Sequence, residues 1–337
     1  MKKIIVLVSV LMTVILCHAQ IEKPDYHSTI MLDARFFKGD NANDDSYGNS
    51  NRFQIRKASF GLEGEINQEI EYALEFGIST CTGSSANVQI SEAVLMYKLF
   101  KNTKIGFQQG HILSSFANKT ECPARLTLDK PDFVKTFGDC HPFGVVVNNY
   151  TALGDFALES ELSYSNGTNT TINGEKQYNV ALMLETPLKG LSFITAYNGV
   201  KKGYYNNLGE TVIHDGYRVS GGMNYEHQNI WLTAEYFTGK AFVSKDQKMN
   251  AWYAQAGYDI PVNQGKIKSL QPYIQYQQWD QNSDSSLSAN KDLMEAGINL
   301  KMSEYTKIRL GYILMTEDPE NSAKSPDSFI VRLQTGF

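Results

Sequence analysis

The clearest pattern along the chain is an alternation of apolar and polar residues that recurs in segments of about ten residues. In the last segment, Phe329, Val331 and Leu333 share one face of the expected strand, and Arg332 and Gln334 share the other. This period of two predicts β-strands with one apolar face, and segments of this length suit tilted membrane strands better than soluble ones. We expect sixteen strands, at 28–37, 52–63, 70–78, 88–99, 104–112, 143–150, 156–164, 176–186, 191–198, 215–226, 230–238, 249–260, 269–279, 291–301, 305–315 and 326–337.

Three of these segments have imperfect alternation, at 143–150, 191–198 and 269–279, and Pro272 lies inside the last. Proline is rare in the interior of a sheet because it has no N–H to donate. The expected count therefore carries a margin of two strands.

The connections between segments alternate in length. Those after odd-numbered segments are long and polar, as at 38–51 and 113–142, and most of those after even-numbered segments are short, as at 64–69 and 227–229. Outer-membrane barrels have short periplasmic turns and long external loops, whereas a soluble sandwich has no reason to sort its loops in this way. We therefore predict an all-β fold, a 16-stranded antiparallel transmembrane β-barrel. A closed sheet of that size encloses a lumen too wide for its own side chains to fill, which leaves a water-filled channel.

Composition agrees with this reading. The chain has 19 Tyr and 17 Phe, yet its net charge is −5 and only 20% of its residues are charged. Aromatic residues near strand ends are typical of the two membrane interfaces, although a soluble β protein would place them in its core. The net negative charge argues against a nucleic-acid partner. The expected girdle residues are Phe36, Tyr97, Tyr164, Tyr225, Tyr236, Tyr258, Tyr312 and Phe337.

The N-terminus has the form of an export signal. Lys2 and Lys3 precede a mostly apolar run of thirteen residues from Ile4 to Leu16, too short to span a bilayer. We expect cleavage after Ala19, so that residues 1–19 are a signal peptide and residues 20–337 are the barrel. A lipoprotein signal with Cys17 as the lipidated residue is the alternative, but Leu16 is bulky for such a site.

Several motifs then appear in a recognisable order. An arginine-rich stretch at 52–64 ends in a glycine-containing turn, and stretches at 72–76, 90–98 and 104–110 follow, with Ser115-Phe116 after them. This order resembles the phosphate-selective porin O and P family. The resemblance implies a sixteen-stranded porin of the Gram-negative outer membrane, typically a homotrimer, that admits small anions. Its partners would be outer-membrane lipid and lipopolysaccharide, small solutes and ions, and the outer-membrane assembly machinery, with Phe337 as the C-terminal assembly signal.

The charges expected inside the barrel do not suit the phosphate selectivity that the family name implies. If the apolar parity faces lipid, acids outnumber bases in the lumen, so a basic ladder that selects phosphate is not predicted. We expect passive diffusion of small hydrophilic solutes and ions, with anions including phosphate as a narrower possibility. Facing opposite charges also hold neighbouring strands together. The acids are Asp33, Glu63, Glu71, Glu75, Glu92, Glu159, Glu161, Glu185, Glu226, Glu235 and Glu295, and the bases are Arg35, Lys57, Lys98, Arg218, Lys301, Lys307, Arg309 and Arg332.

The longest connection, at 113–142, is expected to fold inward and narrow the pore, because a loop of this length in a compact fold is usually functional. Our hypothesis places its cations at a constriction opposite three glutamates of the wall. The alternative is that its charges are solvated outside the barrel. The constriction residues are Lys119, Arg125 and Lys130 on the loop and Glu71, Glu75 and Glu92 on the wall.

Cysteine spacing adds one expectation. Cys122 and Cys140 lie in the same long loop, and an oxidising export route permits a disulfide between them. Cys81 lies in another loop, and its pairing with either remains open because three cysteines leave one over.

No catalytic motif is present, the histidines are scattered, and neither a metal site nor a cofactor is predicted. We therefore expect no enzyme. The alternative function is an exported soluble β-rich protein that binds carbohydrate or serves adhesion, in which Tyr and Trp would stack on ligands.

Overall fold

The computed structural model describes residues 24–38, 51–79, 88–137, 142–166, 176–205, 211–240, 248–281, 289–303, 305–317 and 327–336. The expected signal peptide, Cys81, Cys140 and Phe337 lie outside these residues.

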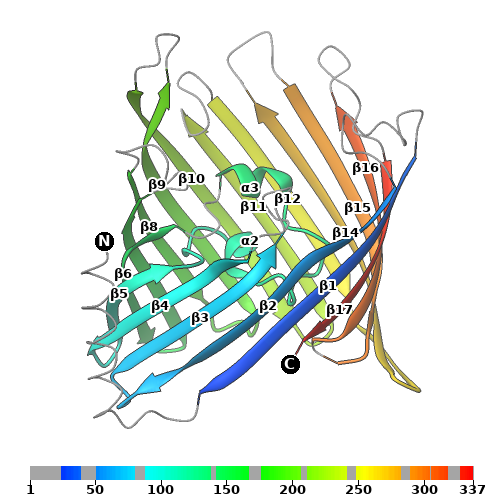
Figure 1. The fold of residues 1–337 in the computed structure, drawn as a ribbon, viewed down its shortest axis with the longest axis horizontal. Coiled ribbons are helices and arrows are strands. Elements are labelled where there is room, and N and C mark those ends of the chain that lie inside the picture. Colours follow the sequence, from blue (N-terminus) through cyan, green and yellow to red (C-terminus); the bar gives the residue numbers. More distant parts are fainter. Residues whose placement is uncertain are drawn as a thin grey trace.

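The strands form one antiparallel sheet that closes on itself (Figure 1). Closure is made by β1, which pairs with β2 on one side and with β17 on the other. The short β13 continues β12, since both pair with β14, and the wall is therefore a 16-strand barrel as predicted. The strands are β1 (Asp25–Lys38), β2 (Arg52–Ile66), β3 (Ile70–Ser79), β4 (Gln89–Phe100), β5 (Thr103–Gln109), β6 (Phe143–Leu153), β7 (Phe156–Ser165), β8 (Lys176–Glu185), β9 (Leu191–Tyr205), β10 (Thr211–His227), β11 (Ile230–Lys240), β12 (Lys248–Tyr258), β13 (Ile260–Gln264), β14 (Ile267–Gln281), β15 (Ala289–Lys301), β16 (Lys307–Glu317) and β17 (Asp327–Gly336).

Each predicted segment coincides with a wall strand, and the weak ones have physical explanations. The ladder between β12 and β14 stops at the pair Gly257 and Tyr273 and resumes at Ile260 and Leu270. Pro272 lies on β14 opposite this gap. A missing N–H at that position accounts for the interruption. Strand β5 ends at Gln109, earlier than predicted, because the chain leaves the wall there.

The two faces of the wall differ as the alternation predicts. Large apolar side chains such as Phe60, Leu95 and Leu162 are exposed on the outer face, whereas Arg309 and Glu295 are buried on the inner face. A soluble protein would reverse this arrangement. Of the expected girdle residues, the exposed ones are Phe36, Tyr97, Tyr164, Tyr236 and Tyr258.

Residues 110–137, which we call the inner segment, lie within the outline of the barrel (Figure 1). The segment contains two short helices, α2 (Phe116–Lys119) and α3 (Asp132–Phe137). The Ser115 side chain caps α2 by accepting a hydrogen bond from the Asn118 N–H at 3.0 Å. None of the described helices is long and apolar enough to cross a membrane.

Apolar residues of the inner segment pack against the wall. Phe133 and Val134 join a buried cluster with Phe237 and Tyr253, and the Phe133 and Phe237 rings meet edge to face at 5.1 Å between centroids. A second buried cluster joins Leu113 and Phe116 to β8 and β9. One side of the lumen therefore contains a packed core. The sequence predicted that residues 113–142 fold inward, but it did not predict this apolar packing against the wall.

Candidate functional site

The start of α2 is held by a carboxylate of the wall. The free N–H groups of Phe116 and Ala117 donate to the two oxygens of Glu235 at 2.7 and 3.0 Å. The Tyr253 hydroxyl donates to the same carboxylate at 2.5 Å. Glu235 is buried, and these three donors supply the hydrogen bonds that a buried carboxylate requires.

Two further glutamates bind the inner segment in the same manner. The Leu113 N–H donates to Glu161 at 3.1 Å, and the Leu128 N–H donates to Glu295 at 2.7 Å. The Tyr273 hydroxyl also donates to Glu295, at 2.8 Å. Strands β7, β11 and β15 thus each provide one carboxylate to main-chain N–H groups of the segment.

Basic side chains of the wall bind the carbonyl groups. Lys307 donates to the Pro123 carbonyl at 2.8 Å. Arg309 donates to the Leu126 carbonyl at 3.2 Å and to that of Arg125. Arg332 donates to the Leu128 carbonyl. N–H groups of the segment therefore donate to carboxylates of the wall, and its carbonyl groups accept from basic side chains of the wall.

Arg332 also forms a buried ion pair with Asp33, with Nε and Oδ1 2.6 Å apart. The two residues face one another in the register of β17 and β1. This pair joins the first and last strands of the sheet at the level of the inner segment.

Charges on β2 to β5 are in a different environment. Lys57 pairs with Glu75 at 3.1 Å, and Lys104 pairs with Glu71 at 2.7 Å. The Lys104 side chain is 42% exposed, whereas Arg309 beneath the inner segment is 0% exposed. Water therefore reaches Lys104 and Glu71 on this part of the wall and is excluded from Arg309 beneath the segment.

The structure separates the six expected constriction residues. Lys119 is exposed and pairs with Glu159 at 2.6 Å. Arg125 and Lys130 are buried, and the partners seen for them lie in the inner segment: Arg125 Nε donates to the Thr120 carbonyl at 3.2 Å, and Lys130 Nζ donates to Asn118 Oδ1 at 3.3 Å. On the wall, Glu71 and Glu75 form the ion pairs above, and Glu92 is half-buried on β4.

The remaining basic residues expected in the lumen have separate surroundings. Arg35 lies directly opposite Arg52 in the register of β1 and β2, and both guanidinium groups lie over the Phe37 ring, at 5.6 and 6.0 Å from its centroid. Arg218 is buried and donates from Nε to Asn198 Oδ1 at 3.0 Å.

Sequence reasoning missed Arg56. Its Nη2 lies 3.0 Å from Asp129 Oδ1, so it forms an ion pair with the inner segment. Pairing of Met31 with Lys57 and of Leu32 with Ile55 leaves Arg56 as the extra residue of a β-bulge. The sequence carries a signal for this bulge, because the exposed apolar positions shift parity between Ile55 and Ala58.

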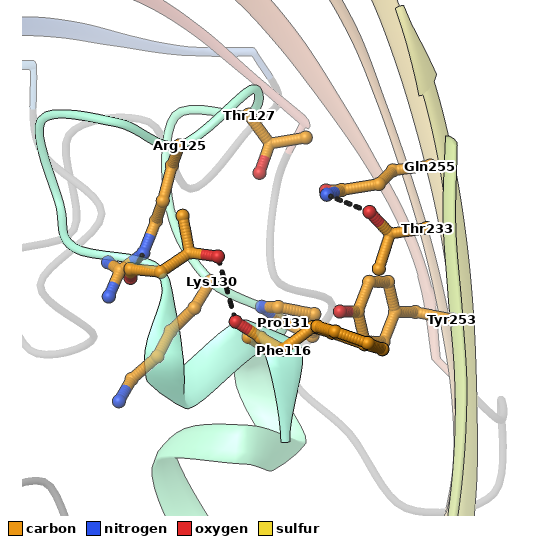
Figure 2. Close-up of a pocket in the computed structure, with 10 residues that line it drawn as sticks. Phe116, Arg125, Thr127, Lys130, Pro131, Thr233, Tyr253 and Gln255 are labelled. Carbon is orange, nitrogen blue, oxygen red and sulfur yellow. Dashed lines mark hydrogen bonds between the residues drawn. The ribbon is translucent and has the colours of Figure 1, made fainter. Parts of the chain in front are cut away.

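A small cavity lies between the inner segment and the wall strands β11 and β12 (Figure 2). Its volume is about 30 Å³, and it is partly open to solvent. Thr127 and Thr120 line it from the segment, and Thr233 and Gln255, which are hydrogen-bonded at 3.2 Å, line it from the wall. These polar groups suit bound water.

Metal and thiol chemistry receive little support. Among the residues that the structure describes, no group of three His, Cys, Asp or Glu side chains is placed to hold a metal ion. The Cys122 sulfur accepts from Arg125 Nη1 at 3.1 Å. Its expected disulfide with Cys140 stays a prediction, because Cys140 is outside the described residues.

The sequence matches the family model for phosphate-selective porin O and P over residues 30–189. The resemblance found in the sequence is thereby confirmed. A comparison with curated proteins finds no match.

Solved structures of outer-membrane proteins share the fold of this chain. OmpF of Salmonella typhi, in complex with daunomycin, is 13% identical with a TM-score of 0.63, over 94% of this chain and 98% of that one. An anion-selective porin from Comamonas acidovorans is 11% identical with a TM-score of 0.61, over 94% and 99%. The trimer form of OmpT, an outer membrane protein of Vibrio cholerae, is 11% identical with a TM-score of 0.61, over the same fractions. The family match over residues 30–189 and the shared fold support the predicted localisation in the Gram-negative outer membrane.

Proposed function

We propose that the porin is a passive diffusion channel for small hydrophilic solutes and ions, which pass between the inner segment and the wall formed by β2 to β5. The observation that carries this proposal is the contrast in exposure between Lys104 on that wall and Arg309 beneath the segment. Hydrated, charged side chains on one side of the lumen are what an aqueous path requires. An exported soluble binding protein is not favoured, since it would not expose an apolar outer face.

The charges along this path support weak selectivity. Lys57 pairs with Glu75, Lys104 with Glu71, and Lys119 with Glu159, so opposite charges largely offset one another. General passage is therefore preferred to phosphate specificity. Anions including phosphate are among the solutes admitted, and the cluster of Arg35, Arg52 and Arg56 supports their entry.

The remaining expectations belong to the same proposal. The chain acts as a homotrimer in contact with outer-membrane lipid and lipopolysaccharide, it is inserted by the outer-membrane assembly machinery, and it has no catalytic activity. The trimer form of the Vibrio cholerae protein supports the first of these.

Planar-bilayer recording from the purified, folded protein tests the channel. We expect stepwise conductance increments that grow with salt concentration, and a small reversal potential in a KCl gradient. Replacing chloride with phosphate should change the current only modestly. A folded preparation that inserts without conductance would overturn the proposal.

Deletion of residues 113–142, joined by a short glycine linker, tests whether the inner segment narrows the channel. We expect single-channel conductance to rise about two-fold or more, because conductance grows with the cross-section of an aqueous pore. Heat-modifiable gel mobility should show that the deleted form is still a barrel. Equal conductance in the two folded forms would contradict the constriction.

A further inference from the structure

Three glutamates that the sequence assigns to the pore wall have a different environment from the other lumen carboxylates. Glu161, Glu235 and Glu295 are buried without a lysine or arginine partner, whereas Glu75, which is also buried, and the more exposed Glu71 pair with lysines. Within the described residues, no Lys or Arg side chain lies at ion-pair distance from any of the three. Their hydrogen-bond partners are neutral groups, chiefly N–H groups of the inner segment.

We propose that Glu161, Glu235 and Glu295 are positioning residues that set the width and solute cut-off of the channel by holding the inner segment against one side of the wall. They do so without contacting the permeating solute. The inference rests on the proposed channel function and adds to it the groups that fix its aperture.

The spacing of the contacts supports this role. The three carboxylates come from β7, β11 and β15, and they bind the segment at Leu113, at Phe116 and Ala117, and at Leu128. The glutamates hold the segment near its start and again at Leu128, and Lys307 and Arg309 hold the carbonyl groups of the stretch between these points. A segment fixed at separated points keeps one distance from the opposite wall.

Side chains on neighbouring strands orient the three carboxylates. Tyr253 on β12 donates to Glu235, and Tyr273 on β14 donates to Glu295, each from the neighbouring strand. Asn179 on β8 donates to Glu161 at 3.1 Å. Because each wall strand supplies a donor that fixes its neighbour's carboxylate, the binding positions belong to the rigid sheet.

Contacts to the main chain also explain why carboxylates occupy these positions. A buried carboxylate that accepts two or three N–H or O–H groups is satisfied, and loss of the segment would leave it short of donors. The side chains of the segment remain free for packing, as Phe116 and Leu113 show by joining a buried apolar cluster.

Single-channel recording and liposome swelling with sugars of increasing size test the proposal. For the double variant Glu235→Ala and Glu295→Ala we expect about a two-fold rise in conductance, frequent fluctuation between conductance levels, and entry of sugars that the wild type excludes. Glu69→Ala, which removes an exposed carboxylate of the short turn between β2 and β3, is the control and should behave as wild type. The conservative variant Glu235→Gln, which keeps one oxygen to accept an N–H, should lie closer to wild type than Glu235→Ala.

The outcomes separate the two proposals. Absence of conductance in the folded wild type refutes the channel function itself. A conducting wild type, together with variants of unchanged conductance and sugar cut-off, overturns the positioning role. If the double variant does not reach the heat-modifiable form, the single variants Glu235→Ala and Glu295→Ala are compared with wild type in the same assays, and unchanged values in both overturn it equally.

Discussion

At the scale of single residues, Arg332 shows that a charge inside a barrel can serve structure. Its side chain is buried between Asp33 on the first strand and the Leu128 carbonyl of the inner segment, and it lies 3.4 Å from Asp129. Periodicity alone assigned it to the lumen correctly. It gave no means of separating Arg332 from Lys98, because the same alternation assigned both to the lumen and they differ only in what covers them.

Replacement of Arg332 by Met should destabilise the folded barrel by about 3–5 kcal/mol, since the buried Asp33 carboxylate would lose its charged partner. Lys104→Met, which breaks the exposed pair with Glu71, should cost no more than about 1 kcal/mol. Guanidinium-induced unfolding in detergent, followed by tryptophan fluorescence, measures both. Equal effects of the two substitutions would contradict the assignment of Arg332 to a buried network.

At the scale of elements, the strands were predictable because each is a direct consequence of period-two alternation. The β-bulges also leave a signal in the sequence. The exposed apolar positions shift parity between Ile90 and Ala93, as they do at the bulge of β2, and the pairing of β3 with β4 is irregular at the same place. The helices of the inner segment were not predictable, because they are four and six residues long and depend on contacts such as Phe116 with Glu235, far apart in sequence.

The bulge at Arg56 yields a deletion test. Removal of Arg56 should leave a regular ladder in which Lys57 still faces the lumen, so the barrel should fold with loss of the contacts of Arg56, including the ion pair with Asp129. Removal of Ala58 should turn Lys57 toward lipid, at a cost of about 2–4 kcal/mol near the middle of the membrane.

Heat-modifiable gel mobility after refolding into detergent gives the folded fraction of each deletion. We expect a high yield for the Arg56 deletion and a low yield for the Ala58 deletion. The reverse order, or equal yields, would contradict the assignment of Arg56 as the extra residue of the bulge.

At the scale of the whole molecule, the barrel combines a soluble-like core with an aqueous path. Phe133 and Phe237 pack inside the lumen as they would in a globular protein, while the wall near Lys104 and Glu71 remains hydrated. The sequence predicted the closed sheet, the loop that departs from it and the sign of most lumen charges. It did not predict which half of the lumen is filled, because that depends on contacts between the segment and strands spread over the whole chain.

The proposed homotrimer is tested on the folded protein in mild detergent. We expect amine-reactive cross-linking of unheated samples to give a ladder that ends at three chains, and light scattering corrected for detergent to give about three times the chain mass of 37.8 kDa. A boiled sample, which is unfolded, is the control. A folded preparation that stays at one chain mass would contradict the trimer.

The contact of Arg332 with both Asp33 and the Leu128 carbonyl has a consequence for biogenesis. The carbonyl belongs to a segment synthesised well before β17, and the aspartate belongs to β1, so one guanidinium joins early, middle and late parts of the chain. A nascent barrel that lacks its final strand has an unpaired seam at β1 and also lacks a donor for the segment in its interior. Seam closure and docking of the segment are therefore completed by the same strand, and a chain truncated before it fails in both respects at once.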